Sequence, residues 1–72
     1  MEEIMSIAKV IEVISEGDSV EGAVEAAVRD AGRTVREIKQ VYVEGIQALV
    51  EDNLVVKYRI NAKVTFVVDE GD

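Results

Sequence analysis

Residues 54–68 alternate apolar and polar side chains almost without interruption. The apolar positions are Leu54, Val56, Tyr58, Ile60, Ala62, Val64, Phe66 and Val68, and the polar positions are Lys57, Arg59, Asn61, Lys63 and Thr65. Because successive side chains of a strand point to opposite faces, this period of two predicts one long strand with an apolar face and a polar, basic face. The same strand can therefore supply a core and a second, functional surface.

A second apolar segment lies near the start of the chain. Residues 7–14 (IAKVIEVI) are rich in β-branched side chains, and their only charges are Lys9 and Glu12. This composition predicts a strand that is nearly apolar on both sides, which belongs in the interior of a sheet or under a partner. The Glu-Gly-Asp sequence at 16–18 has turn chemistry and is expected to end the strand.

A helix is predicted to begin after Ser19, which is placed to cap it, although Asp18 and Glu21 offer a rival capping box at the same place. Apolar residues then recur at helical spacing: Val20, Ala23, Val24, Ala27, Val28, Ala31 and Val35. Charged residues line the other side. Gly22 and Gly32 weaken the helix and mark a close approach to the sheet or a helix end.

Residues 36–51 predict a second long strand, with a bulge or bend at Gly45. Asp52 and Asn53 tolerate left-handed backbone, so the two long strands should form an antiparallel hairpin. The order strand, helix, strand, strand predicts an α+β domain over residues 1–72, with a three-stranded antiparallel sheet, one helix on one face, and frayed tails at 1–5 and 69–72. The sheet face without the helix is too large to stay bare.

Composition narrows the possible functions. A chain of 72 residues buries too little surface to be more than marginally stable alone, and it has neither cysteine nor histidine. Disulfides, zinc sites, thiol chemistry, imidazole bases and serine triads are therefore excluded, and we expect no enzyme. The apolar fraction of 49% favours cover by other subunits, with a compact two-layer monomer as the alternative.

The net charge of −7 argues against nucleic acid as a partner, because binding to phosphates needs a cationic surface. No segment is apolar for long enough to span a membrane, and Met1-Glu2-Glu3 has the wrong charge for a signal peptide. A soluble, cytoplasmic protein is expected.

Several short segments resemble the dodecin family in order and spacing. They are KVIEV at 9–13, the serine-capped helix rich in alanine and valine, RTVR at 33–36, and YRINAKVTF at 58–66. The resemblance covers roughly residues 7 to 69. It implies a βαββ subunit whose sheet wraps around the helix, with the helix on the outside, and twelve such subunits in a hollow homododecamer.

The resemblance also implies a ligand site. Flavin-binding dodecins stack riboflavin or related flavins such as FMN between tryptophans of symmetry-related subunits, and a glutamine of the last strand holds the ring edge. Alignment places Gln40 at the tryptophan position and Arg59 at the glutamine position, and the chain has no tryptophan. Loss of the aromatic sandwich is expected to weaken flavin binding. A tryptophan-free branch of the family, described as binding calcium, shares this pattern.

The candidates for ligand contact are Gln40, Arg59 and Tyr42, with Tyr58 as a fourth. Gln40 and Arg59 can hydrogen-bond a planar or anionic ligand at the old flavin site, and Tyr42 or Tyr58 can replace part of the stacking surface. The alternatives are that Arg59 pairs with Glu44 or another strand carboxylate in a subunit interface, and that the tyrosines are half-buried. The basic row of Lys57, Arg59 and Lys63 is likewise expected to pair with the strand carboxylates Glu12, Glu44 and Glu51.

Cation binding is the main rival to flavin binding. Acidic residues at the chain ends and in the first loop can gather around a symmetry axis and hold calcium through oxygen: Glu2, Glu3, Glu16, Asp18, Asp69, Glu70 and Asp72. A solvated acidic surface is the simpler interpretation, and the sequence identifies no metal ligands. The sequence therefore predicts a non-catalytic homododecamer that binds or stores a small molecule. The alternatives are a calcium-binding shell with a vestigial flavin site and a structural scaffold without a ligand.

Overall fold

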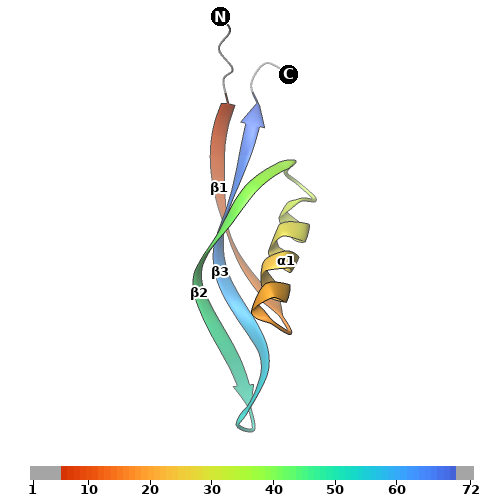
Figure 1. The fold of residues 1–72 in the computed structure, drawn as a ribbon, viewed down its shortest axis with the longest axis vertical. Coiled ribbons are helices and arrows are strands. Elements are labelled where there is room, and N and C mark those ends of the chain that lie inside the picture. Colours follow the sequence, from red (N-terminus) through yellow and green to blue (C-terminus); the bar gives the residue numbers. More distant parts are fainter. Residues whose placement is uncertain (1–5, 70–72) are drawn as a thin grey trace, which may run out of the picture.

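The computed structural model describes residues 6–69 and contains four elements in the predicted order (Figure 1). They are β1 (Ser6–Gly17), α1 (Val20–Ala31), β2 (Glu37–Glu51) and β3 (Leu54–Asp69). The strands form one antiparallel sheet, and α1 lies against one face of it. The predicted βαββ fold is confirmed. The predicted tails lie outside the described residues, except for Asp69, which ends β3.

The order of the strands is β1-β3-β2, so β3 is central and β1 is an edge strand. The prediction that residues 7–14 lie in the interior of a sheet is therefore wrong for the single chain. Strand order depends on which strands meet in space, and the composition of β1 does not determine it. Ile7, Val10 and Ile14 of this edge strand are exposed, so the alternative expectation, cover by a partner, stays a prediction.

Strand β1 also runs further than its sequence indicates. Glu16 and Gly17 pair with Arg59 and Tyr58, because the antiparallel ladder to β3 outweighs their local preference for a turn. At Gly17 the strand lies directly on the start of α1. A Cβ atom there would be 2.6 Å from the backbone nitrogen of Ala23. Only glycine fits at this close approach.

The start of α1 follows the prediction, and its end lies at Gly32, one of the two roles expected for that glycine. The hydroxyl of Ser19 accepts a hydrogen bond of 2.9 Å from the backbone N–H of Gly22, which confirms Ser19 as the cap. Gly32 ends the helix, and its N–H donates to the carbonyl of Val28 at 2.8 Å. The helical spacing of apolar residues continues to Val35 in the sequence, but the helix itself stops at Gly32, since glycine weakens a helix interior.

The core lies between α1 and the central strand. Its buried residues are Ala23, Ala27 and Ala31 of the helix and Ile60, Ala62, Val64 and Phe66 of β3. The small alanine side chains let the helix backbone lie close to the sheet. This confirms the apolar face predicted for the middle of β3. Val28, predicted to lie in the core stripe, is instead exposed at the edge of the helix.

The chain is elongated because the β2–β3 hairpin continues well past the helix (Figure 1). The chain measures 62 × 20 × 14 Å, and its radius of gyration of 15.6 Å exceeds the roughly 11 Å of a compact chain of this length. The hairpin turn has positive φ at Asp52 and Asn53, as predicted. We call residues 46–56 the hairpin arm. Its exposed apolar side chains are Ile46, Val50, Leu54, Val55 and Val56.

Candidate ligand-binding site

The sheet face opposite α1, here called the open face, carries the polar side chains of β3. Since Ile60, Ala62 and Val64 are buried beneath the helix, the intervening residues Arg59 and Lys63 point to the other side. The predicted division of this strand into an apolar and a basic face is confirmed. The open face is therefore the surface on which the candidate ligand contacts should be sought.

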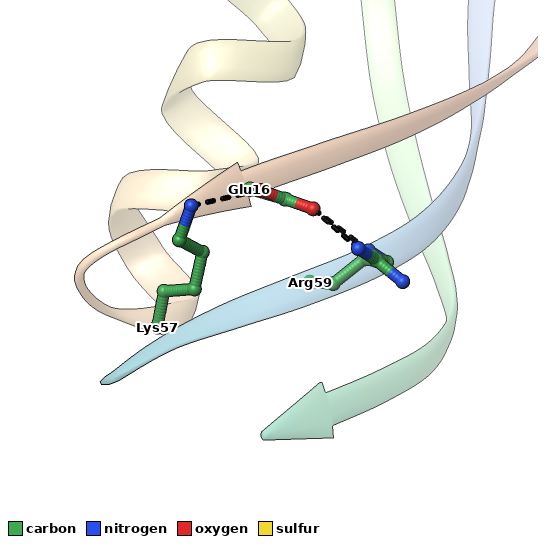
Figure 2. Close-up of polar contacts among 3 residues, drawn as sticks. All are labelled: Glu16, Lys57 and Arg59. Atoms are coloured by element: carbon green, nitrogen blue, oxygen red, sulfur yellow. Dashed lines mark hydrogen bonds and ion pairs between the residues drawn. The ribbon is translucent and has the colours of Figure 1, made fainter. Parts of the chain in front are cut away.

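One carboxylate holds two cations at one end of the open face (Figure 2). Arg59 donates from Nε to Oε2 of Glu16 over 2.8 Å, and its Nη2 lies 2.7 Å from the same oxygen. Lys57 donates from Nζ to Oε1 of Glu16 over 3.3 Å. The expected pairing of Arg59 with a strand carboxylate thus occurs within one chain, and its partner is Glu16.

These contacts change the acidity of Glu16. The hydrogen bond from Arg59, followed by that from Lys57, holds the pKa of the Glu16 carboxyl below its ordinary value of 4.5. Partial loss of water around the carboxyl opposes this shift but does not cancel it. Glu16 is therefore a carboxylate at neutral pH. The sequence predicts a turn at Glu16 and does not indicate this role, although its spacing of four residues from Glu12 is that of two residues on the same strand face.

A second ion pair lies in the middle of the open face. Lys63 is 3.2 Å from Oε2 of Glu44 on β2 and faces Glu12 on β1. Glu12 makes no ion pair with any residue between 6 and 69. The predicted pairing of Lys63 with a strand carboxylate is confirmed, whereas Lys57 and Arg59 use Glu16.

The part of the open face between the rows of Lys57 and Lys63 is electrically balanced even though the chain carries −7. Its cations are Lys57, Arg59 and Lys63, and its carboxylates are Glu12, Glu16 and Glu44. Further along this face, Glu37 pairs with Lys39. Each of the three cations already has a carboxylate partner in the same chain. An external anion must compete with these partners for every cation of this face.

The structure places Gln40 and Tyr42 on the open face but far from Arg59. Gln40 pairs with Thr65 of β3, and Tyr42 pairs with Lys63. Thr65 lies six positions after Arg59 along β3, which corresponds to about 20 Å at 3.3 Å per residue. A single chain therefore does not bring Gln40 and Arg59 to one small ligand.

The bulge predicted at Gly45 is confirmed by a shift of register between Val43 and Gly45. The shift places Gln47, on the far side of the bulge, opposite Arg59. Tyr42 is 60% exposed, so its ring is available for contact, whereas Tyr58 is half-buried and alternates with Arg59 onto the helix side. Tyr42 is thus the better placed of the two tyrosines for a ligand on the open face.

The hollows along the sheet in residues 6–69 do not bring the predicted ligand residues together. A shallow hollow of about 200 Å³ lies at mid-sheet on the open face between Glu12, Glu44 and Asn61. This volume is below the roughly 300–1,000 Å³ of ligand pockets. A larger hollow of about 680 Å³ opens between residues 34–37 and 66–68, and it contains none of the predicted ligand residues.

The metal prediction concerns mostly residues outside the described range. Within residues 6–69 there is no group of three acidic, histidine or cysteine side chains that could hold an ion. Glu2, Glu3, Glu70 and Asp72 lie outside that range. Calcium binding thus stays a prediction. The helix present in residues 6–69 is too short and too polar to cross a membrane.

Comparisons of the sequence and of the structure with known proteins indicate the same family. The sequence model of the Dodecin family matches residues 7–69. Dodecin from Streptomyces coelicolor is 28% identical and superposes with a TM-score of 0.83, over 92% of this chain and 96% of that one. An arginine-to-alanine variant of the Thermus thermophilus dodecin is 24% identical, with a TM-score of 0.84 over 93% of this chain and 100% of that one.

Dodecin from Streptomyces davaonensis has the same fold at 18% identity, with a TM-score of 0.83 over 90% of this chain and 97% of that one. A comparison with curated protein sequences gives no match. The family match spans nearly all of the described residues and agrees with the βαββ fold, the order of the elements and the long β2–β3 hairpin. The chain therefore belongs to the dodecin family.

Proposed function

We propose that this chain is the subunit of a homododecamer that binds and stores a small ligand of the flavin class, without catalysis, at sites completed between copies. Dodecins are small flavin-binding proteins, and members of the family form dodecamers. The ligand contacts that we assign to this chain are Gln40, Tyr42 and Arg59.

The separation of Gln40 and Arg59 is the observation that carries this proposal. Both lie on the open face, yet about 20 Å of β3 separates their rows. The hollow between these rows is too small for a ligand. Since the open face carries polar groups suited to recognition but forms no complete pocket, a second copy has to close the site.

The shape of the subunit supports assembly. The hairpin arm projects beyond the helix and exposes apolar side chains on both of its faces. Large exposed apolar patches usually mark interaction sites. Contact with neighbouring copies would remove this surface from water. The burial of this surface would add stability that the small core of a 72-residue chain lacks.

The chemistry of the open face supports weak rather than tight flavin binding. Stacking between paired tryptophans is absent because the chain has none, and Tyr42 is the exposed aromatic side chain on this face. Gln40 offers both amide donors and an acceptor, and Arg59 offers N–H donors for ring carbonyls. Tyr42 would supply one stacking surface for each copy.

A flavin titration of the purified assembly tests the proposal. Riboflavin fluorescence is followed while light scattering reports the mass. Quenching by a species of about twelve subunits supports the proposal, and Tyr42→Ala should weaken the quenching whereas Tyr58→Phe should not. An intact dodecamer that does not quench flavin contradicts it.

The same assembly, melted with calcium and then with chelator, tests the cation alternative. Thermal stability that rises with calcium and falls with chelator would favour a calcium-binding shell. An assembly whose melting responds to neither flavin nor calcium would favour the structural scaffold.

A further inference from the structure

The backbone that carries Glu16 is held in place on both sides. The two neighbours of Glu16 in the chain, Ser15 and Gly17, both contact the first turn of α1. The hydroxyl of Ser15 donates to the carbonyl of Ala23 over 2.8 Å, and Gly17 lies against the backbone of Gly22 and Ala23 too closely to admit a Cβ. Glu16 itself pairs with Arg59 across the ladder to β3.

Glu16 uses both of its oxygens on the two cations of this end of the sheet. Oε2 accepts from Arg59 at 2.8 Å and Oε1 from Lys57 at 3.3 Å (Figure 2). An external phosphate or carboxylate would have to displace an anion that is covalently part of the protein and is already in place. Such a preorganised partner competes at a high effective concentration.

We propose that Glu16 is a specificity-determining residue, a built-in anion that occupies Lys57 and Arg59 so that this end of the open face takes uncharged planar ligands and excludes phosphorylated or carboxylated ones. The ligand class rests on the proposed function, whereas the occupation of the two cations by Glu16 does not. The negative charge of the chain acts in the same direction, since it repels anions from the whole assembly.

Arg59 keeps donors for an uncharged ligand. Its Nε and Nη2 both contact Oε2 of Glu16, and its Nη1 makes no hydrogen bond to any residue between 6 and 69. The two N–H groups of Nη1 can donate to a carbonyl oxygen of a neutral ring while the carboxylate stays in place. Gln47, opposite Arg59 on β2, can add an amide donor or acceptor at the same row.

A comparison of riboflavin with FMN tests the ligand class, because these ligands differ by one phosphate. Native protein should bind riboflavin more tightly than FMN. Glu16→Gln frees two cations and should raise the affinity for FMN relative to riboflavin about tenfold, as expected for a charge-assisted contact. Glu12→Gln removes the same charge from the same face without freeing an ion pair, and should leave the ratio within about twofold.

Inorganic phosphate provides a test that needs no flavin. In the native protein, millimolar phosphate should leave the NMR signal of the Arg59 Nε–H unchanged, and in Glu16→Gln it should shift that signal. Glu12→Gln should behave like the native protein. Glu16→Ser serves as a second variant. The amide oxygen of a glutamine can still accept a hydrogen bond from Arg59, whereas the serine side chain is too short to reach it.

The outcomes separate the two proposals. If an intact native assembly quenches neither flavin, the proposed function fails, and the phosphate titration still decides whether Glu16 blocks anions. The inference about Glu16 is overturned if native protein binds phosphate at Arg59 as well as Glu16→Gln does. It is also overturned if FMN binds the native protein more tightly than riboflavin, or if Glu12→Gln and Glu16→Gln change the flavin ratio equally.

Discussion

Arg59 and Glu16 face each other across the ladder between the central strand and the end of the edge strand, and Nε and Nη2 of Arg59 lie 2.8 and 2.7 Å from Oε2 of Glu16. The pair joins β3 to β1 near the end of β1, just before the chain enters α1. It thus couples a residue proposed to contact ligand with the junction that positions the helix.

This pair should make stability depend on pH in a defined direction. The folded pKa of Glu16 is lowered, so its contribution to stability is complete above the ordinary pKa of 4.5 and is lost as the pH falls through the lower folded value. We expect native protein to be more stable than Glu16→Gln at pH 7, and the difference to vanish at acidic pH. Denaturant unfolding at fixed protein concentration, from pH 7 to pH 2.5, measures it.

Glu12→Gln is the control for this measurement, since Glu12 lies on the same strand face and makes no ion pair with a described residue. Its effect on the free energy of unfolding at pH 7 should be small. A difference between native protein and Glu16→Gln that stays constant down to pH 2.5 would show that the ion pairs with Arg59 and Lys57 do not stabilise the fold.

The close packing of β1 on α1 predicts a large effect of one methyl group. In Gly17→Ala the new Cβ would lie 2.6 Å from the nitrogen of Ala23, a backbone atom that cannot move without shifting the helix. We expect a loss of about 1–3 kcal/mol in the free energy of unfolding, as for overpacked cores.

Gly45→Ala provides the matched control, because the nearest atom to its Cβ, Oδ1 of Asn61, would be 3.9 Å away. This variant should change stability by less than about 1 kcal/mol and in the stabilising direction, since alanine restricts the unfolded chain more than glycine does. Equal midpoints of denaturant unfolding for Gly17→Ala and native protein would contradict the close approach.

The parts of the fold that depend on local pattern could be predicted from the sequence. The alternation of residues 54–68 predicts both faces of β3 correctly around Ile60 and Val64. The left-handed preference of Asp52 and Asn53 predicts the hairpin turn, and Ser19 predicts the start of the helix. Each of these features is set by residues that are neighbours in the sequence.

The parts that depend on distant contacts could not be predicted in this way. Glu16 has turn chemistry locally, and only its pairing with Arg59 makes it a strand residue. The edge position of β1 follows from strand order, which period and composition do not encode. For the candidate site, the sequence placed Gln40 and Arg59 on facing strands, but it could not show the distance of about 20 Å between their rows.

The proposed assembly predicts that charge on the hairpin arm prevents oligomer formation. Val56 is 44% exposed on the arm, and in the assembly it should be covered by a neighbouring copy. Val56→Asp would then bury a carboxylate without a partner, which is strongly unfavourable. Light scattering should show a smaller particle than the native protein forms.

Asn53→Asp tests whether charge alone causes this loss. It adds the same negative charge to the turn of the same hairpin without removing an apolar side chain, and aspartate tolerates the positive φ of 63° at this position. This variant should keep the native mass. Dissociation of both variants, or of neither, would argue against an apolar contact at Val56.

Restoring an aromatic ring at Gln40 should strengthen flavin binding. Gln40 is exposed on the open face opposite Thr65, so a tryptophan there can be accommodated without repacking the core. Stacking is worth about 0.5–1.5 kcal/mol beyond the area it buries, and together these contributions should raise flavin affinity about tenfold or more.

Gln47→Trp is the control variant, because it places the same ring on the same face at the row of Arg59, and it should have a smaller effect. Fluorescence quenching of riboflavin measures both variants. Equal gains for the two would mean that Gln40 has no special place in the site, whereas no gain for Gln40→Trp in an intact assembly would remove it from the ligand contacts.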